Sequence, residues 1–331
     1  MSRIFLTFPL HARKNYYSDR ALAGLRALGE VALNETDHAL ATPELAAAAK
    51  GFQFIVADRQ TRGDGELFRR LPDLVAFSRC AVDIRNVDVA TASDCGILIT
   101  QASAGFMTSV AEWILGAMID LSRRISASVV AYRAGETAIP AMGRELRGST
   151  LGVVGYGNIG RRLCELALAL GMRVAITDPA RTADDPRIAQ LGFGELVAAA
   201  DFVVCLAPAN THTESLFDAR AFARMKPTAY FINASRGDLV DESALERALD
   251  GELIAGCALD VGRAPDQMPT PSLARHPKVI ATPHVGGLTP EAAEHQAVET
   301  VAQVALLIEG RIPEGAVNAA HATRLARLRG R

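Results

Sequence analysis

The sequence predicts an α/β protein built from two doubly wound parallel sheets. Short β-rich runs alternate with helical patterns from one end of the chain to the other, as βαβ units require. A glycine-rich turn joins a strand to a helix near the middle, and one long amphipathic segment separates two α/β series. At 331 residues the chain is long enough for two domains, each with its own core.

The first hundred residues form the first series. Their candidate strands are RIFLTF, FQFIVA, LVAFS and ILIT. Their candidate helices are DRALAGLRAL, PELAAAA, ELFRRL and DVATAS. This alternation predicts a small α/β layer structure.

One long helix is predicted from Thr108 to Gly135. Val110, Ile114 and Met118 recur along it at helical spacing and form an apolar stripe. A helix of this length between two α/β blocks suits a domain connector.

The second series begins after this helix. Its candidate strands are TLGVV, RVAITD, DFVVCLA, AYFINAS, IAGCALDV and KVIATPH. A Thr-Pro helix start then opens a last helix over residues 289–310. Because the second series is already complete, this helix is a candidate to pack back on the first domain.

The segment GVVGYGNIG places Gly155, Gly157 and Gly160 in GxGxxG spacing. GxGxxG alone is weak evidence, but here the glycines follow an apolar strand and open an amphipathic helix. The glycines permit a tight turn and close backbone approach, and the free N–H groups of the helix start attract a pyrophosphate. The segment therefore predicts a dinucleotide site of the Rossmann type.

The next strand ends in Asp178, eighteen residues beyond Gly160. A carboxylate there accepts hydrogen bonds from the ribose hydroxyls and repels a 2′-phosphate, which favours NAD. Arg181 lies close by and leaves NADP as the less favoured alternative.

Three polar residues follow three strands of the second series. Arg236 follows the strand that ends INAS, Asp260 follows GCAL, and His284 follows VIATP. Ligands of open α/β sheets bind at the carboxyl ends of the strands. The ordinary alternative is that the histidine is solvated and the arginine lies on the surface. This alternative is the weaker interpretation, because three such groups follow strands beside a dinucleotide motif.

With these segments in view, the sequence resembles the D-isomer-specific 2-hydroxyacid dehydrogenase family. The matching segments are GVVGYGNIG with Asp178, NASRGDLVDESAL, GCALDV and TPHVGG, in the family's order and close to its spacing. RCAVDIRNVD resembles the family's substrate loop, and TSVAEW its connector helix.

The resemblance implies a Rossmann NAD-binding domain, residues 102–288, inserted into a flavodoxin-like substrate domain formed by residues 1–101 and 289–331. It implies an NAD-dependent oxidoreductase that interconverts a 2-keto acid and a D-2-hydroxy acid. A homodimer through the long helix is expected on the same ground.

The resemblance also assigns roles to residues. Arg236 would bind the substrate carboxylate and polarise the carbonyl, and His284 would act as the acid and base. The backbone N–H groups of Ala81, Val82 and Asp83 would hold the other end of the carboxylate. The implied cofactor contacts are Gly155, Gly157, Asn158, Ile159, Gly160, Asp178, Ala207, Pro208, Ala234, Ser235, Arg236, Asp260, His284, Gly286 and Gly287.

One family feature is missing. The family supplies a glutamate five residues after the Asp of its ALDV segment, where it raises the pKa of the catalytic histidine, but that position is Pro265 here. Asp266 is the preferred substitute and a candidate catalytic residue; Gln267 and an unassisted histidine are the alternatives. Arg263 either attracts a second anionic group of the substrate or, preferably, is solvated.

Composition excludes several classes of partner. The formal net charge is −2 with mixed signs, which gives no footprint for nucleic acid or for an anionic membrane. No uncharged segment is long enough to span a bilayer. The five cysteines occur singly, so we expect reduced thiols, a cytoplasmic protein and no metal site.

Two other functions stay open. One is a phosphoglycerate-dehydrogenase-like enzyme that acts on a more anionic hydroxy acid. The other is a non-catalytic, NAD-sensing binding protein, of the kind that the C-terminal-binding-protein corepressors represent. Turnover with NADH on 2-keto acids distinguishes the enzymes from the binding protein.

Overall fold

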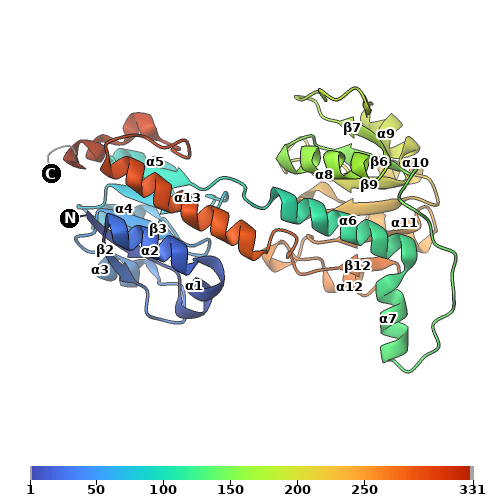
Figure 1. Cartoon of the computed structure of the whole chain (residues 1–331), viewed down its shortest axis with the longest axis horizontal. Helices are drawn as coiled ribbons and strands as arrows, with labels where there is room; N and C mark the ends of the chain where they lie inside the picture. Colours follow the sequence, from blue (N-terminus) through green and yellow to red (C-terminus); the bar gives the residue numbers. More distant parts are fainter. Residues whose placement is uncertain (1, 329–331) are drawn as a thin grey trace. The chain divides into compact units, whose positions relative to one another are not determined.

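The computed structural model describes residues 2–328, except for the side chain of Asp266. The chain divides into two compact units (Figure 1). Unit 1 combines Met1–Phe106 with Thr289–Arg331, and unit 2 is Met107–Leu288. Each unit contains a parallel β-sheet with helices beside it, so the predicted fold class is confirmed.

Unit 1 contains a five-stranded sheet in the order β2-β1-β3-β4-β5, the flavodoxin-like order. Its strands are β1 (Ser2–Leu6), β2 (Gly29–Leu33), β3 (Phe54–Ala57), β4 (Ala76–Arg79) and β5 (Leu98–Gln101). Its helices are α1 (Leu10–Tyr16), α2 (Asp19–Leu28), α3 (Thr42–Ala48), α4 (Gly65–Arg70), α5 (Val89–Asp94) and α13 (Pro290–Ile308), followed by two 3-10 turns (Ala319–His321 and Thr323–Leu328).

The strands of unit 1 are buried on both faces. Ile4 and Leu6 of β1 belong to a core cluster that includes residues of α2 and α13, whereas Phe5 belongs to a cluster with residues of α3 and α4. Because side chains alternate along a strand, one short apolar run serves both clusters. α13 lies beside α2 although the two are far apart in sequence (Figure 1).

Unit 2 contains a seven-stranded sheet in the order β12-β11-β10-β9-β6-β7-β8. Its strands are β6 (Thr150–Val154), β7 (Arg173–Thr177), β8 (Ile188–Gln190), β9 (Phe202–Cys205), β10 (Tyr230–Asn233), β11 (Gly256–Leu259) and β12 (Val279–Ala281). Its helices are α6 (Met107–Arg123), α7 (Ile125–Arg133), α8 (Asn158–Ala169), α9 (Phe193–Ala199), α10 (Ala219–Arg224), α11 (Glu242–Asp250) and α12 (Pro271–Ala274), with 3-10 turns at Gly237–Leu239 and Pro265–Gln267. The strand order reverses between β6 and β9, and such a switch point is where this class of sheet binds ligands.

The single long helix predicted over 108–135 is wrong. The helix breaks at Arg124, whose φ of 54° lies in the left-handed region. Beyond the break, the backbone N–H of Ser126 donates to Asp120 Oδ1 at 2.8 Å, so a local side-chain contact starts α7 in a new direction. Two short strands, β2 and β8, were also not predicted from the sequence; β8 has only three residues, two of them exposed.

All five cysteines are free thiols, and four of them are buried. Among the described helices, none is long and apolar enough to cross a lipid bilayer.

Candidate active site

The glycine turn connects β6 to α8, and each glycine meets a different constraint. Gly155 has a φ of 102°, and a Cβ there would lie 2.6 Å from the backbone nitrogen of Ala207. A Cβ on Gly160 would lie 2.4 Å from the carbonyl oxygen of Gly155. The first and third glycines are therefore required by packing within unit 2.

Gly157 is different, because a Cβ there would meet no atom of the described residues within 4 Å. This residue is the N-cap of α8, and no described side chain caps the helix. The N–H groups of the first turn are therefore open to an anionic ligand. The residues present fit the pyrophosphate of a dinucleotide.

Asp178, directly after β7, braces this turn. Its Oδ2 accepts a hydrogen bond from the backbone N–H of Tyr156 at 2.7 Å. Its Oδ1 accepts from the backbone N–H groups of Ala180 and Arg181, at 2.8 and 3.0 Å. The half-buried carboxylate thus holds the glycine turn and its own loop in place, in addition to the ribose contact predicted for it.

Arg236 follows β10 and is positioned by a polar residue that sequence reasoning missed. Asn233, only 1% exposed, donates from Nδ2 to the carbonyl of Arg236 at 2.9 Å and accepts from the N–H of Ser235 at 3.1 Å. The hydroxyl of Ser235 donates to the carbonyl of Ala207, which ties this segment to the loop after β9. The sequence signal that could have identified Asn233 was its place as a polar last residue of an otherwise apolar strand.

His284 lies on a strained turn after β12, with a φ of 56°. Its backbone N–H donates to the carbonyls of Asp260 and Thr282, both at 2.9 Å. His284 is half-buried. A non-glycine residue in this conformation is held there by its surroundings, and such positions gather at functional sites.

The buried carboxylate of Asp260 holds the His284 turn in this conformation. Its Oδ1 accepts from Thr282 Oγ1 at 2.6 Å and from the Val285 N–H at 2.8 Å, and its Oδ2 accepts from the Gly286 N–H at 2.7 Å. A Cβ on Gly286 would lie 2.8 Å from that same Oδ2, which explains the glycine. The histidine turn is therefore fixed by a neighbouring strand end as well as by Pro283 and the glycines.

These groups share one edge of the sheet. Asn233 of β10 pairs with Leu259 of β11, which pairs with Ala281 of β12, and all three strands are parallel. Arg236 and His284 each follow their strand end by three residues. The register therefore brings both to the carboxyl edge, the same edge on which the glycine turn follows β6.

The segment that replaces the family glutamate forms a 3-10 turn, Pro265–Gln267. The side chain of Asp266, the preferred substitute, lies outside the described part of the structure. The Oε1 atom of Gln267 is buried and accepts no hydrogen bond from the described residues, so this oxygen does not hold the histidine ring.

Arg263 is exposed, and its guanidinium is held by several hydrogen bonds. Its Nη2 donates to Glu214 Oε1 at 2.9 Å and to the carbonyl of Asp238 at 3.0 Å, and its Nε donates to the carbonyl of Val240 at 3.1 Å. The guanidinium therefore fastens the loops after β9, β10 and β11 together. The residue is nevertheless exposed, in line with the preferred expectation of a solvated arginine.

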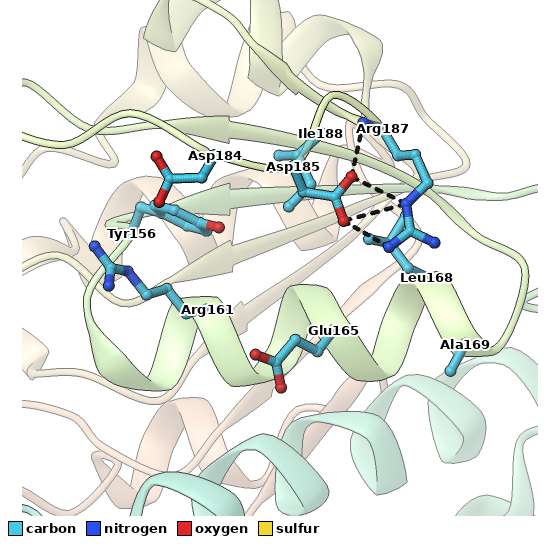
Figure 2. Close-up of a pocket in the computed structure, with 9 residues that line it drawn as sticks. All are labelled: Tyr156, Arg161, Glu165, Leu168, Ala169, Asp184, Asp185, Arg187 and Ile188. Carbon is cyan, nitrogen blue, oxygen red and sulfur yellow. Dashed lines mark hydrogen bonds and ion pairs between the residues drawn. The ribbon is translucent and has the colours of Figure 1, made fainter.

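A pocket of about 500 Å³ runs along α8 (Figure 2). Tyr156 of the glycine turn lines one end, and the guanidinium of Arg161 lies 5.5 Å from the centre of its ring. Across from α8, Asp185 and Arg187 are joined by hydrogen bonds that lower the pKa of Asp185 to about 2. This pocket was not predicted, because it lies between a helix face and a loop with no motif of its own.

The predicted substrate loop lies in unit 1. Ala81 is buried and Val82 is exposed. The backbone N–H of Arg85 donates to Asp83 Oδ1 at 3.0 Å, which turns the chain back after these residues. Among the described residues, no cluster of three or more His, Cys, Asp or Glu side chains is arranged to hold a metal ion.

The open glycine turn, the uncapped start of α8 and the polar groups at the strand ends define a dinucleotide-dependent oxidoreductase. Residues 115–286 match the family described as D-isomer specific 2-hydroxyacid dehydrogenase, NAD binding domain. Since that match covers more than half of the chain, the protein belongs to this family of NAD-dependent oxidoreductases acting on CH–OH donors. NAD is its cofactor.

Relatives of this chain are named as dehydrogenases or reductases of different substrates. The chain is 36% identical to (S)-sulfolactate dehydrogenase of Chromohalobacter salexigens, over 78% of this chain and 86% of the relative. It is 30% identical to hydroxypyruvate reductase of Thermotoga maritima, over 82% and 90%. It is 32% identical to D-3-phosphoglycerate dehydrogenase of Bacillus subtilis over 81% of this chain, but it spans only 51% of that relative's length.

Solved structures share the fold. The TT0316 protein from Thermus thermophilus is 29% identical and has a TM-score of 0.82, with 95% of this chain and 99% of that chain covered. The NAD-complexed D-isomer specific 2-hydroxyacid dehydrogenase from Lactobacillus delbrueckii ssp. bulgaricus is 22% identical and has a TM-score of 0.80, over 96% and 100%.

Proposed function

We propose that this dehydrogenase interconverts a 2-keto acid and the corresponding D-2-hydroxy acid, with Arg236 and His284 as its catalytic residues. The observation that carries the proposal is the register of β10, β11 and β12, which brings both residues to the edge that holds the glycine turn. When bound, NADH would supply the hydride for reduction, and NAD would accept it in the reverse direction.

Arg236 binds the substrate carboxylate through its fork of N–H donors and polarises the carbonyl. The buried Asn233 fixes the main chain on both sides of it, so the guanidinium starts from a rigid base. Nη1 of Arg236 also donates to the carbonyl of Ser235 at 2.7 Å, which helps to orient the guanidinium plane.

His284 donates a proton to the developing alkoxide oxygen during reduction and removes it during oxidation. The fixed turn matters because proton transfer requires the ring and the oxygen within hydrogen-bonding distance. We assign Asp266 as the carboxylate that assists the ring. An Asp266→Asn enzyme should lose keto-acid reduction at a lower pH than the parent; identical pH–rate profiles would remove Asp266 from the mechanism.

The backbone N–H groups of Ala81, Val82 and Asp83 complete the carboxylate site in this proposal. We assign unit 1 as the substrate domain, residues 1–101 and 289–331, and residues 102–288 as the NAD-binding domain. The cofactor contacts proposed from the sequence all belong to unit 2: Asp178, Asp260 and residues of the segments 155–160, 207–208, 234–236 and 284–287.

Turnover of NADH with a panel of 2-keto acids tests the function. We expect activity in the parent and a loss of about 10³-fold or more in kcat/KM for Arg236→Ala and His284→Ala, with NADH still bound. Arg220→Ala, in the N-terminal turn of α10, is the control and should match the parent. Tight NADH binding without turnover of any 2-keto acid would instead favour the binding protein.

A second anionic group on the substrate is the specific alternative that the relatives favour, because one of them is named for sulfolactate. Arg59 and Arg62 follow β3 in unit 1, and both side chains are exposed. They flank the buried Thr61 on the same loop. The panel should therefore contain a sulfonated and a phosphorylated keto acid. A raised KM for these substrates alone in Arg59→Ser or Arg62→Ser would assign the arginines to that second group.

We also propose a homodimer formed through α7. None of its residues is buried, although it carries Val129, Val130 and Tyr132, which are exposed by 41, 65 and 66%. The helix stands apart from the sheet of unit 2 (Figure 1). A second copy of the chain would cover this apolar face. Light scattering should give a dimer for the parent and a monomer for Val130→Asp; a monomeric parent would refute the proposal.

A cytoplasmic location is part of the proposal. Its support is that all five cysteines are free, as suits a reducing compartment.

A further inference from the structure

Arg79 is the largest side chain in the chain's core that is fully shielded from solvent. It is the last residue of β4 and stands directly before the loop that carries Ala81, Val82 and Asp83. A charged side chain is rarely buried without a compensating role, because removing it from water is costly. Its position at a carboxyl strand end adds weight to that expectation.

The guanidinium joins two loops. Its Nη1 donates to the carbonyl of Asp58. Its Nη2 donates to the carbonyl of Thr61 at 2.7 Å and to Asn86 Oδ1 at 2.7 Å. The first two acceptors belong to the loop after β3, and Asn86 belongs to the far end of the loop after β4. One side chain therefore closes the substrate loop and fastens it to its neighbour.

The loop after β3 is itself rigid. Thr7, Asp58 and Thr61 are all buried, and Thr61 Oγ1 donates to Thr7 Oγ1 at 2.7 Å. The backbone N–H of Thr61 donates to Asp58 Oδ1 at 2.9 Å. Arg79 thus connects the substrate loop to a preformed network that reaches β1.

These three acceptors of Arg79 are neutral oxygens, and the carboxylates of Asp58 and Asp83 interact electrostatically with its charge. Burial lowers the pKa of Arg79 to about 10, which still leaves the group positively charged at neutral pH. Its Nε has no hydrogen-bond partner among the described residues. In a buried setting charges interact over several ångströms with little screening, so the guanidinium also attracts the carboxylate of Asp83 in the substrate loop. The backbone N–H groups of residues 81–83 lie within a few residues of this charge along the chain.

We propose that Arg79 is a positioning residue for the substrate: its guanidinium fixes the loop that binds the carboxylate. The inference rests on the proposed function, because it assumes that residues 81–83 bind the substrate carboxylate. Arg79 acts through the loop and does not touch the substrate, since its side chain is fully buried.

The test compares Arg79→Gln and Arg79→Lys with the parent. Loss of hydrogen bonds to a charged group predicts a KM for the keto acid raised about 10- to 100-fold in Arg79→Gln. Arg79→Lys keeps the charge but not the fork, so its KM should lie between the two. The value of kcat should stay within about threefold, and NADH affinity should not change, because the cofactor residues belong to unit 2.

Arg324→Gln is the matched control. Arg324 also belongs to unit 1 and donates to two main-chain carbonyls, those of Leu71 and Leu74, both at 2.8 Å. These precede β4, whereas Arg79 ends it. The control loses the same kind of bonds at the amino edge of the sheet and should keep the parent's KM. An equal rise in KM in both variants would overturn the proposal by assigning the effect to general loosening of unit 1.

If Arg79→Gln does not fold, Asn86 provides the test. Asn86→Asp and Asn86→Ala both lose the amide donors to the carbonyls of Arg59 and Thr61. Only Asn86→Ala also loses the acceptor for Nη2 of Arg79, because the aspartate retains an oxygen at this place. KM should therefore rise more in the alanine variant; an equal or larger rise in the aspartate variant would overturn the role of the contact between Arg79 and residue 86. If the parent enzyme turns over no 2-keto acid, the proposed function and this inference are both refuted. If the parent is active and the variants keep its KM, only the inference is refuted.

Discussion

A single buried carboxylate, Asp260, determines the geometry of the catalytic turn. Its oxygens accept hydrogen bonds from Thr282, Val285 and Gly286, on both sides of His284. The family resemblance also implies a contact between Asp260 and the nicotinamide carboxamide. That contact must use the lone pairs of the carboxylate that these three hydrogen bonds leave unoccupied. The proton transfer that we propose for His284 therefore depends on a residue that does not itself exchange the proton.

Asp260→Ala should lower kcat/KM by about 100-fold, because a turn released by even ~1 Å misplaces the ring. NADH affinity should fall less than the rate does, since the glycine turn is unaffected. Steady-state kinetics and NADH fluorescence titration measure the two effects. Asp218→Ala is the control, because Asp218 also accepts two backbone N–H bonds but caps α10. Parent-like kinetics for Asp260→Ala would show that the His284 turn keeps its conformation without the Asp260 carboxylate.

The buried thiols predict a loss of stability at alkaline pH. Burial raises the pKa of Cys205 from 9.0 to about 12, and the same holds for Cys80 and Cys164. Above pH 9 the unfolded chain releases these protons while the folded chain retains them. Stability is therefore full below about pH 9 and is lost as the pH rises towards 12, by about 1 kcal/mol per pH unit for each thiol.

Urea unfolding between pH 8 and pH 10.5 measures this loss. Cys205→Ala should reduce the loss of stability per pH unit by the contribution of one thiol. Cys95→Ala should not reduce it, because Cys95 is only partly buried. Equal slopes in the parent and in Cys205→Ala would contradict the assignment.

At the scale of elements, the glycine turn divides into packing and binding positions. Gly155→Ala places a Cβ against the backbone of Leu206 and Ala207 at a φ of 102°, and should destabilise the protein by more than about 3 kcal/mol. Gly157→Ala meets no described atom within 4 Å, so stability should change by less than about 1 kcal/mol. Its NADH affinity should nevertheless fall about tenfold or more, because the Cβ occupies the path of the pyrophosphate.

Thermal unfolding and NADH titration separate these two effects. Unchanged NADH affinity in a stable Gly157→Ala protein would show that the dinucleotide does not approach this residue.

Motif-bearing elements were the easiest to predict. β6 and α8 were found because strand, glycines and helix stripe agree with one another. The break between α6 and α7 was missed, since the apolar pattern continues through Arg124 and only the contact between Ser126 and Asp120 interrupts it. The pocket along α8 was missed for a related reason: it depends on where the loop before β8 runs.

At the scale of the whole molecule, the chain returns to its first unit after completing the second. α13 contributes Ala297, Val304 and Leu307 to the core cluster that contains Ile4. Beyond the helix, Asn318 accepts from the N–H of Ile99 at 2.8 Å and donates to the carbonyl of Ile97 at 2.9 Å. The last segment thereby completes the hydrogen bonding of the edge strand β5.

Asn318→Ala should destabilise unit 1 by about 2–4 kcal/mol, because it leaves buried main-chain groups without partners. Hydrogen exchange resolved by segment should show faster exchange in β5 and unchanged exchange in β6. Asn210→Ala, in an exposed loop of unit 2, is the control. Faster exchange in both sheets would mean that the two units unfold together.

The sequence by itself determined most of the strands in their order, the dinucleotide motif and the choice of Arg236 and His284 as candidate catalytic residues, because these depend on local patterns and fixed spacings. Only the tertiary structure decided that Asp260 clamps the histidine turn, that Arg263 fastens loops, and that Arg79 fastens the end of β4 to the loop after β3. Those roles rest on hydrogen bonds between residues some 20 or more positions apart, and no local pattern specifies which donor reaches which acceptor.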